Sequence, residues 1–167
     1  ILNETPENIA SRLPLFFDKI LIDAPCSGEG MFRRDPGAVK SYMNYGPKVC
    51  VPLQESILEA AHNCLKDGGS IVYSTCTFCV DEDENQIKRF IEHHPEYHVK
   101  AHPEIMGITH NGEDSILPGS MRIWPHLSEG DGHFCVHIVK GEEKDLKSAA
   151  DYLINSEVRT KDKNVEA

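Results

Sequence analysis

The sequence predicts an α/β fold built on a doubly wound, mostly parallel sheet that ends in an antiparallel hairpin. Two short apolar runs, 17–22 and 70–74, are typical of strands buried in a parallel sheet. A helical pattern lies between them and another follows the second, as in strand–helix–strand units. Two further strand-like runs, 121–124 and 134–139, are joined by a segment containing Gly-Asp-Gly, which is a hairpin signal.

The elements can be placed in order along the chain. Residues 1–14 should contain a short helix, because Pro6 suits a first helical turn. The continuously apolar run 20–22 should be a strand buried on both faces. We expect Pro52 to open the next helix and Gly68 to cap its C-terminal end. The apolar face of that helix should consist of Leu53, Ile57, Ala60, Ala61, Cys64 and Leu65.

Four consecutive acidic residues, 81–84, precede the last helical pattern, which Pro95 should end. Negative charge is favourable at a helix N-terminus, so this run is interpreted as a helix start. The composition then divides the chain in two. Residues 1–140 form one domain, and residues 141–167 are expected to be a polar helix or a linker.

The composition of the 167 residues, with 40% hydrophobic and 26% charged, is typical of a globular protein. No membrane span or secretion signal is apparent, so we expect a cytoplasmic protein with reduced cysteines. The net charge of −10 argues against a nucleic-acid partner. The acids are unevenly placed, however, and four basic residues with few acids between them follow the first cysteine loop: Arg33, Arg34, Lys40 and Lys48.

Two predicted strands run into loops that each carry a cysteine, within 23–28 and 74–77. In an open α/β sheet, ligands bind beyond the carboxyl ends of the strands, so Cys26 and Cys76 should face one cleft. A thiolate in a polar, partly exposed loop can act as a nucleophile. The alternatives are a pair of buried structural thiols, and a zinc pair or redox disulfide formed with Cys79. The zinc pair lacks a clear second half, so no metal is expected.

The motifs Asp23-Ala24-Pro25-Cys26-Ser27-Gly28-Glu29-Gly30 and Ser74-Thr75-Cys76-Thr77, at this separation, resemble the two signatures of the Sun-type RNA cytosine-5 methyltransferases. The similarity extends through 122–126 and 130–134 and covers roughly residues 1–140. It is closest to the bacterial branch that modifies ribosomal RNA. The resemblance implies the later strands of a Rossmann-like, SAM-dependent methyltransferase sheet.

The resemblance also implies roles for individual residues. Cys76 would be the nucleophile that adds to carbon 6 of cytosine, and Cys26 would assist release of the product. Asp23 would hold the polar edge of the base and lie against S-adenosyl-L-methionine (SAM). Pro25 and Asn3 would be further cofactor contacts. The target base must be unpaired or flipped to reach such a pocket.

The glycine-rich SAM loop and the ribose-binding acid of the family have no counterpart in this sequence. We therefore expect the chain to carry the C-terminal half of the catalytic domain and to be inactive alone. The alternative is an incomplete fragment that acts only as a module for binding RNA or a partner. An isolated half-sheet would expose an unpaired edge, through which the chain could self-associate.

Overall fold

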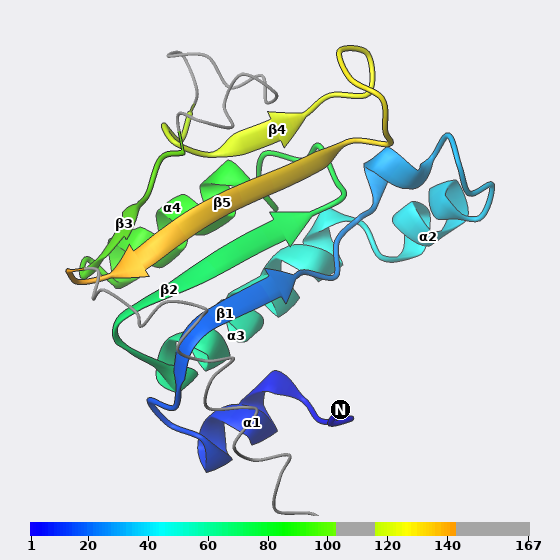
Figure 1. The fold of residues 1–167 in the computed structure, drawn as a ribbon. Coiled ribbons are helices and arrows are strands. Elements are labelled where there is room, and N and C mark those ends of the chain that lie inside the picture. The colour runs from blue at the N-terminus through cyan, green and yellow to red at the C-terminus, as the bar shows by residue number, and fades with distance from the viewer. Residues whose placement is uncertain (103–115, 143–167) are drawn as a thin grey trace, which may run out of the picture.

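A computed structural model describes residues 1–102 and 116–142 as one sheet with helices packed against it (Figure 1). The elements follow in the order α1 (Pro6–Arg12), β1 (Phe17–Asp23), the 3₁₀ turn η1 (Glu29–Met31), α2 (Ala38–Asn44), α3 (Pro47–Cys64), β2 (Leu65–Thr75), α4 (Glu84–His93), β3 (Tyr97–Val99), β4 (Met121–Ile123) and β5 (His133–Lys140). The short first helix is confirmed, with Thr5 as its N-cap.

The sheet is mixed, with the order β1-β2-β5-β3, and β4 also pairs with β5. Strands β1 and β2 are parallel, and β5 runs antiparallel to β2, β3 and β4. The expected final hairpin is therefore confirmed as β4 and β5. Because β1 and β2 are parallel and adjacent, the loops that follow Asp23 and Thr75 leave the sheet at the same edge.

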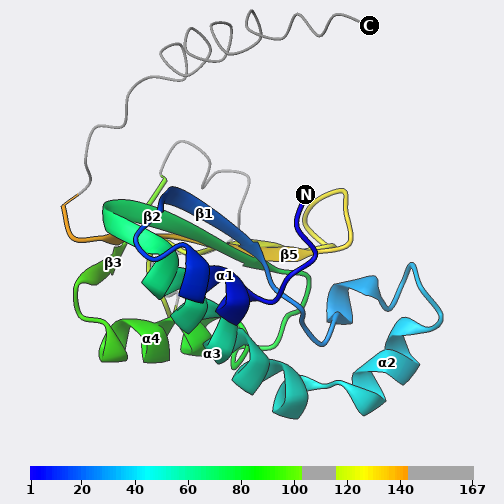
Figure 2. The same cartoon turned by 90° about the horizontal axis from the view of Figure 1, so that it is seen from below.

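The helices α1, α3 and α4 all lie on one face of the sheet (Figure 2). The hydrophobic core fills the space between that face and the helices. Its fully buried members come from α3, β2, α4 and β5: Leu58, Ile71, Tyr73, Ile87, Phe134, Val136 and Ile138. The core fixes the positions of the strands and hence of the loops at their carboxyl ends.

The expectation that β1 is buried on both faces is wrong. Ile22 packs in the core, whereas the neighbouring Leu21 is 73% exposed. Successive side chains of a strand point to opposite faces. In the described part of the chain, β1 lies at the end of the sheet and no helix covers the face to which Leu21 points.

The expected boundaries of the long helix are also wrong. Helix α3 begins at Pro47, so Pro52 lies inside it and removes one backbone hydrogen bond near its start. The helix ends at Cys64, and the N–H of Leu65 caps it. Gly68, with φ of 78°, instead forms a bend within the residues of β2.

The buried face of α3 agrees with the expected one at Ala60, Ala61 and Cys64 and differs near the start of the helix. Leu53 is 45% exposed, and the fully buried side chain beside it is Gln54. The Gln54 side chain donates hydrogen bonds to the Pro25 carbonyl and to the Glu82 carboxylate. A polar residue therefore occupies a core position because its partners come from other segments.

Helix α4 does begin within the acidic run 81–84, but these residues are not a solvated helix start. Glu82, Asp83 and Glu84 are all buried. The buried Arg122 of β4 makes a two-pronged ion pair with Glu84, at 2.6 and 2.5 Å, and lies 2.9 Å from Asp83. Three members of the acidic run therefore lie inside the molecule, and two of them are paired with Arg122.

Among the described residues, no helix is both long and apolar enough to span a membrane. The polar helix or linker expected over 141–167 falls almost entirely outside the described residues.

Candidate functional site

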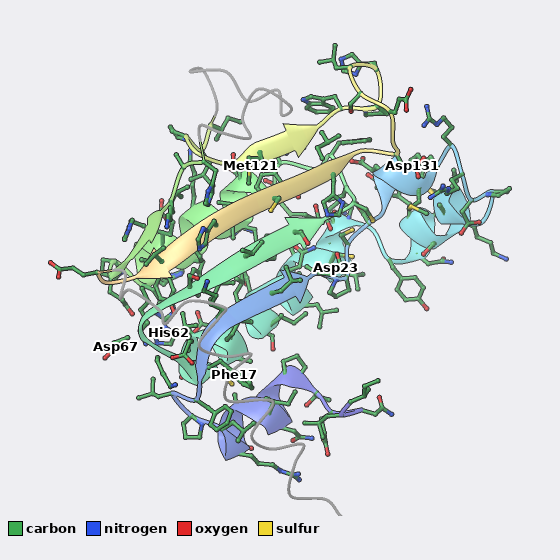
Figure 3. The ribbon with its side chains drawn as sticks, viewed as in Figure 1. Phe17, Asp23, His62, Asp67, Met121 and Asp131 are labelled. Atoms are coloured by element: carbon green, nitrogen blue, oxygen red, sulfur yellow. The ribbon has the colours of Figure 1, made fainter. Side chains whose placement is uncertain are left out.

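The two cysteine loops meet at the carboxyl edge of β1 and β2, as expected. The sulfur atoms of Cys26 and Cys76 lie 3.4 Å apart, and both thiols are free and partly buried. The strand tips are joined by the Ala24 N–H, which donates to the Ser74 carbonyl, and by the Ser74 hydroxyl, which lies 3.4 Å from Asp23 Oδ1. Figure 3 shows Asp23 at this end of the sheet, near Asp131 of the β4–β5 loop.

The two thiols are not equivalent. The hydrogen bond from Cys26 lowers the pKa of Cys76 to about 7, although burial and the charges of Asp23 and Glu82 act in the opposite direction. The same hydrogen bond, together with burial, raises the pKa of Cys26. At neutral pH, Cys26 therefore stays protonated and donates to a Cys76 thiolate, which is the nucleophilic form of cysteine.

This asymmetry predicts the pH at which Cys76 reacts. Alkylation of Cys76 by iodoacetamide, followed peptide by peptide with mass spectrometry, should be half-maximal near pH 7. In Cys26→Ala the midpoint should rise toward about 8.5, the ordinary cysteine value, because the donor to the thiolate is gone. Cys79→Ala is the matched control and should leave the midpoint unchanged. An unshifted midpoint in Cys26→Ala would show that the sulfur contact does not activate Cys76.

A buried hydrogen-bond network holds the two loops together. The Ser27 and Thr77 hydroxyls lie 2.8 Å apart, and Thr77 also donates to the Glu29 carboxylate. Glu29 accepts a second hydrogen bond from the Phe78 N–H at 2.9 Å. Each cysteine is thus followed directly by a hydroxyl residue that ties its loop to the other, which fixes the two sulfurs in contact.

Glu82 holds the loop that carries Cys26 in place through hydrogen bonds. Its carboxylate accepts a hydrogen bond from the Ser27 N–H and another from Gln54, both at 2.9 Å, while the Tyr73 hydroxyl donates to its carbonyl. Sequence reasoning missed this role, because Glu82 sits in an acidic run that also suits a helix start. Its partners are 28 and 55 residues away, so no local pattern could reveal them.

Gly30 allows the loops to approach closely. Its N–H donates to the Cys76 carbonyl at 2.9 Å. A Cβ atom at this position would lie 2.7 Å from that carbonyl oxygen and 2.8 Å from the carbonyl oxygen of Asp131. Gly30 is therefore required, because the first cysteine loop, the Cys76 loop and the β4–β5 loop approach one another at this position.

An open hollow of about 480 Å³ runs along β1 beside the thiol pair. Asp23 and Pro25 line its end, and its walls are mostly apolar residues of β1, α1 and α3: Ile9, Phe17, Ile20, Leu21, Ile22, Ile57, Ala60 and Ala61. Two of the three expected cofactor contacts thus lie together. Asn3 is exposed and is not part of this wall, to which the adjacent Glu4 contributes.

The two arginines that follow the first motif lie over the β4–β5 loop. Arg33 donates to the Gly130 carbonyl at 2.8 Å, and Arg34 makes a 2.9 Å ion pair with Asp131. Both side chains remain largely exposed, at 67% and 71%. They link this loop to the segment after Cys26 and leave positive charge at the open end of the site.

The mixed sheet, with paired thiols at the carboxyl end of its parallel strands, defines a Rossmann-like α/β protein with a cysteine-based site. The sequence model of the 16S rRNA methyltransferase RsmB/F family matches residues 2–139, and the chain belongs to that family.

Among curated proteins, the chain is similar to ribosomal RNA small subunit methyltransferase F of Erwinia tasmaniensis, with 30% identity over 77% of this chain. The protein of the same name from Escherichia coli O157:H7 is 34% identical over 78% of the chain. The chain spans 27% of the length of each of these relatives.

Solved structures show the same fold. A methyltransferase homologue from Pyrococcus horikoshii superposes with a TM-score of 0.60 at 26% identity, over 83% of this chain and 44% of its own. NSun6 from the same organism, solved with SFG, gives a TM-score of 0.68 at 23% identity, over 85% of this chain and 34% of its own. At that identity the second match supports the fold alone.

Proposed function

We propose that the protein carrying this chain methylates carbon 5 of cytosine in ribosomal RNA through a covalent adduct with Cys76. The observation that supports the proposal most directly is the 3.4 Å contact between two free thiols of unequal acidity. The rRNA methyltransferase family supplies the reaction class and the substrate class.

The chemistry follows from the polarity of the cytosine ring. Carbon 5 is too weakly nucleophilic to accept a methyl group. A thiolate that adds to carbon 6 converts the ring to an enamine-like form whose electrons are available at carbon 5. After carbon 5 gains the methyl group it loses its proton, and the carbon 6–sulfur bond breaks to return the Cys76 thiolate.

Asp23 and Cys26 have separate roles in this proposal. The exposed Asp23 carboxylate accepts hydrogen bonds from the polar edge of the base and stabilises the charge shift in the ring, as a preorganised group. The Cys26 thiol is hydrogen-bonded to the Cys76 sulfur. The same hydrogen bond stabilises the thiolate as it leaves carbon 6, so Cys26 promotes release of the product.

The residues that line the hollow beside β1 match the chemical groups of SAM. The apolar walls suit an adenine ring, and the Asp23 carboxylate can face a positive sulfonium group. When bound, SAM supplies the methyl group. Asp23 and Pro25 would hold it next to the thiol pair, and Asn3 would lie near the adenine from the start of the chain.

RNA is the proposed partner despite the net charge of −10. Buried carboxylates at 82–84 account for part of that charge, and the exposed Arg33 and Arg34 border the site. Phosphates can therefore meet positive charge at the open end of the site.

Release of tritium from RNA labelled at carbon 5 of cytosine tests the proposal. The full-length protein should release tritium from small-subunit ribosomal RNA in a SAM-dependent manner, because methylation replaces the proton at carbon 5. Labelled methyl transfer without tritium release would place the methyl group on another atom and overturn the cytosine-5 assignment.

The same assay on the 167-residue chain alone distinguishes the alternative function. A module that binds RNA or a partner should retain RNA in a filter-binding assay and release no tritium. We expect the isolated chain to behave in this way, because the hollow along β1 is open rather than enclosed. Full turnover by the isolated chain would contradict this expectation.

A further inference from the structure

At the opposite end of the sheet from the thiols, three metal-ligating side chains converge. His62 lies in the last turn of α3, His94 caps the C-terminus of α4, and Glu96 precedes β3. One ligand atom of each lies within 4.8 Å of the other two, in the only such group of three found in residues 1–102 and 116–142. Figure 3 places His62 far from Asp23, so this cluster is separate from the thiol site.

We propose that His62, His94 and Glu96 bind a divalent transition-metal ion of the Zn²⁺ type at a structural site. Two imidazole nitrogens and one carboxylate oxygen are a common protein ligand set for Zn²⁺. Sequence reasoning did not detect the set, because His62 and His94 are 32 positions apart and no local spacing links them.

The hydrogen bonds around the histidines orient their rings. His94 Nε2 lies 2.8 Å from the Glu59 carboxylate, which can only accept, so the Nε2 atom is the donor in this contact. The other ring nitrogen, His94 Nδ1, lies 3.8 Å from Glu96 Oε1. A carboxylate behind the distal nitrogen is the usual arrangement for a metal-binding histidine.

His62 faces the same oxygen. Its Nδ1 lies 3.8 Å from Glu96 Oε1 and 3.2 Å from the Tyr97 hydroxyl, which can donate to it. One ring nitrogen of each histidine thus faces the same carboxylate oxygen at 3.8 Å, which is too long for a hydrogen bond.

The distances suit a metal ion after a small contraction. Tetrahedral ligands about 2.1 Å from Zn²⁺ lie about 3.4 Å from each other. The two histidine–glutamate separations are 3.8 Å, and the ring centroids of His62 and His94 lie 4.1 Å apart with the rings tilted by 32°.

The local electrostatics favour a cation. The C-terminal ends of α3 and α4 both lie here, and helix C-termini carry partial negative charge. Glu59 and Glu96 add two carboxylates. The Lys140 ammonium, which opposes a metal, is itself paired with Asp67 at 3.3 Å and bonded to the Leu65 carbonyl.

The backbone around the ligands is held in place. The Gly141 N–H donates to the Glu96 carbonyl at 2.7 Å, and the Tyr97 N–H donates to the His94 carbonyl at 3.0 Å. A metal ion here would join the ends of two helices to the start of β3. Its expected effect is therefore on stability rather than on the reaction at the thiols.

Titration of the protein with Co²⁺ and Zn²⁺ tests the proposal. Co²⁺ should give visible bands of a tetrahedral complex with nitrogen and oxygen ligands, saturating at one equivalent per chain. Because thiols also attract these metals, sulfur-to-metal charge-transfer bands in the near ultraviolet would signal binding at Cys26, Cys76 or Cys79 instead. Calorimetry with Zn²⁺ in a Cys76→Ser/Cys79→Ser background should still show the site.

The variants identify the ligands. Glu96→Gln changes a partly exposed residue, so folding is preserved, and Zn²⁺ affinity should fall at least tenfold. His94→Gln should have the same effect, with circular dichroism of the metal-free protein as the check on folding. His93→Gln, which alters the exposed neighbour of His94, is the matched control and should bind as the parent does. No binding below millimolar Zn²⁺, or equal binding by Glu96→Gln and His93→Gln, would overturn the proposal.

Discussion

In the full-length enzyme, replacing Cys76 with Ala should reduce methylation by about a thousandfold or more, as is typical when a covalent nucleophile is removed. No thiolate would remain at the position of the Cys76 sulfur to add to carbon 6 of cytosine, and burial still raises the pKa of the remaining Cys26 thiol. Denaturing gels with substrate RNA and SAM should show no protein–RNA complex for this variant.

Replacing Cys26 with Ala should instead increase the amount of protein–RNA complex on the gel. The Cys26 hydrogen bond stabilises the free Cys76 thiolate but has no charged partner once Cys76 is bound to carbon 6. A hydrogen bond to a charged group contributes about 1.5–3 kcal/mol, so its loss should slow release of the adduct about 10- to 150-fold. A covalent complex should then accumulate and survive denaturation.

Cys79→Ala is the matched control for both variants and should turn over without accumulating a complex. If Cys76→Ala trapped RNA and Cys26→Ala did not, the two roles would be exchanged. If neither substitution changed turnover, the covalent mechanism would be wrong for this protein.

Arg122→Met should destabilise the fold by about 3–5 kcal/mol, which is a large part of the stability of a typical domain. Arg122 is the buried partner of Glu84 and Asp83, and its removal leaves carboxyl groups in the core without their counter-charge. Urea unfolding followed by circular dichroism measures the change. Arg34→Met is the matched control, because its ion pair with Asp131 is exposed and should contribute less than about 1 kcal/mol.

The loss in Arg122→Met should depend on pH. Burial raises the pKa of Asp83 to about 8, although the Thr75 hydrogen bond and the charge of Arg122 act in the opposite direction. A carboxyl whose folded pKa is raised stabilises the fold in its protonated form, and this stabilisation is lost as the pH rises through the folded value. Removal of the Arg122 charge raises the pKa of Asp83 further, so above pH 8 only the parent protein keeps a counter-charge for the ionised carboxylate. The stability difference between the parent and Arg122→Met should therefore be largest above pH 8 and smaller toward pH 5. Equal destabilisation at both pH values would show that unpaired carboxylates are not the cause.

Much of the site could be predicted from the sequence. Each cysteine lies within three residues of the end of an apolar strand, and parallel neighbouring strands bring such loops to one edge of the sheet. The contact between Cys26 and Cys76 therefore follows from local patterns and one topological rule. The position of Asp23 at the end of β1 follows from the same reasoning.

The buried contacts that hold the cysteine loops and the nearby strands in place could not be predicted in this way. Glu82 binds the backbone of Ser27, and Glu84 pairs with Arg122, yet both appear in the sequence as members of a charged helix start. Local patterns report the preference of a segment for helix or strand. They do not report which distant group will neutralise a charge, because that depends on how the elements pack.

By itself, the sequence determined the order of the main strands and helices, the final hairpin and the pair of loops that carries the thiols, since these depend on periodicity and short motifs. It did not indicate α2 or β3. The tertiary structure alone decided that Leu21 is exposed and that Gln54 rather than Leu53 faces the core. It also decided that His62, His94 and Glu96 meet. Burial and side-chain contacts depend on packing between segments far apart in the chain, which a local sequence pattern does not encode.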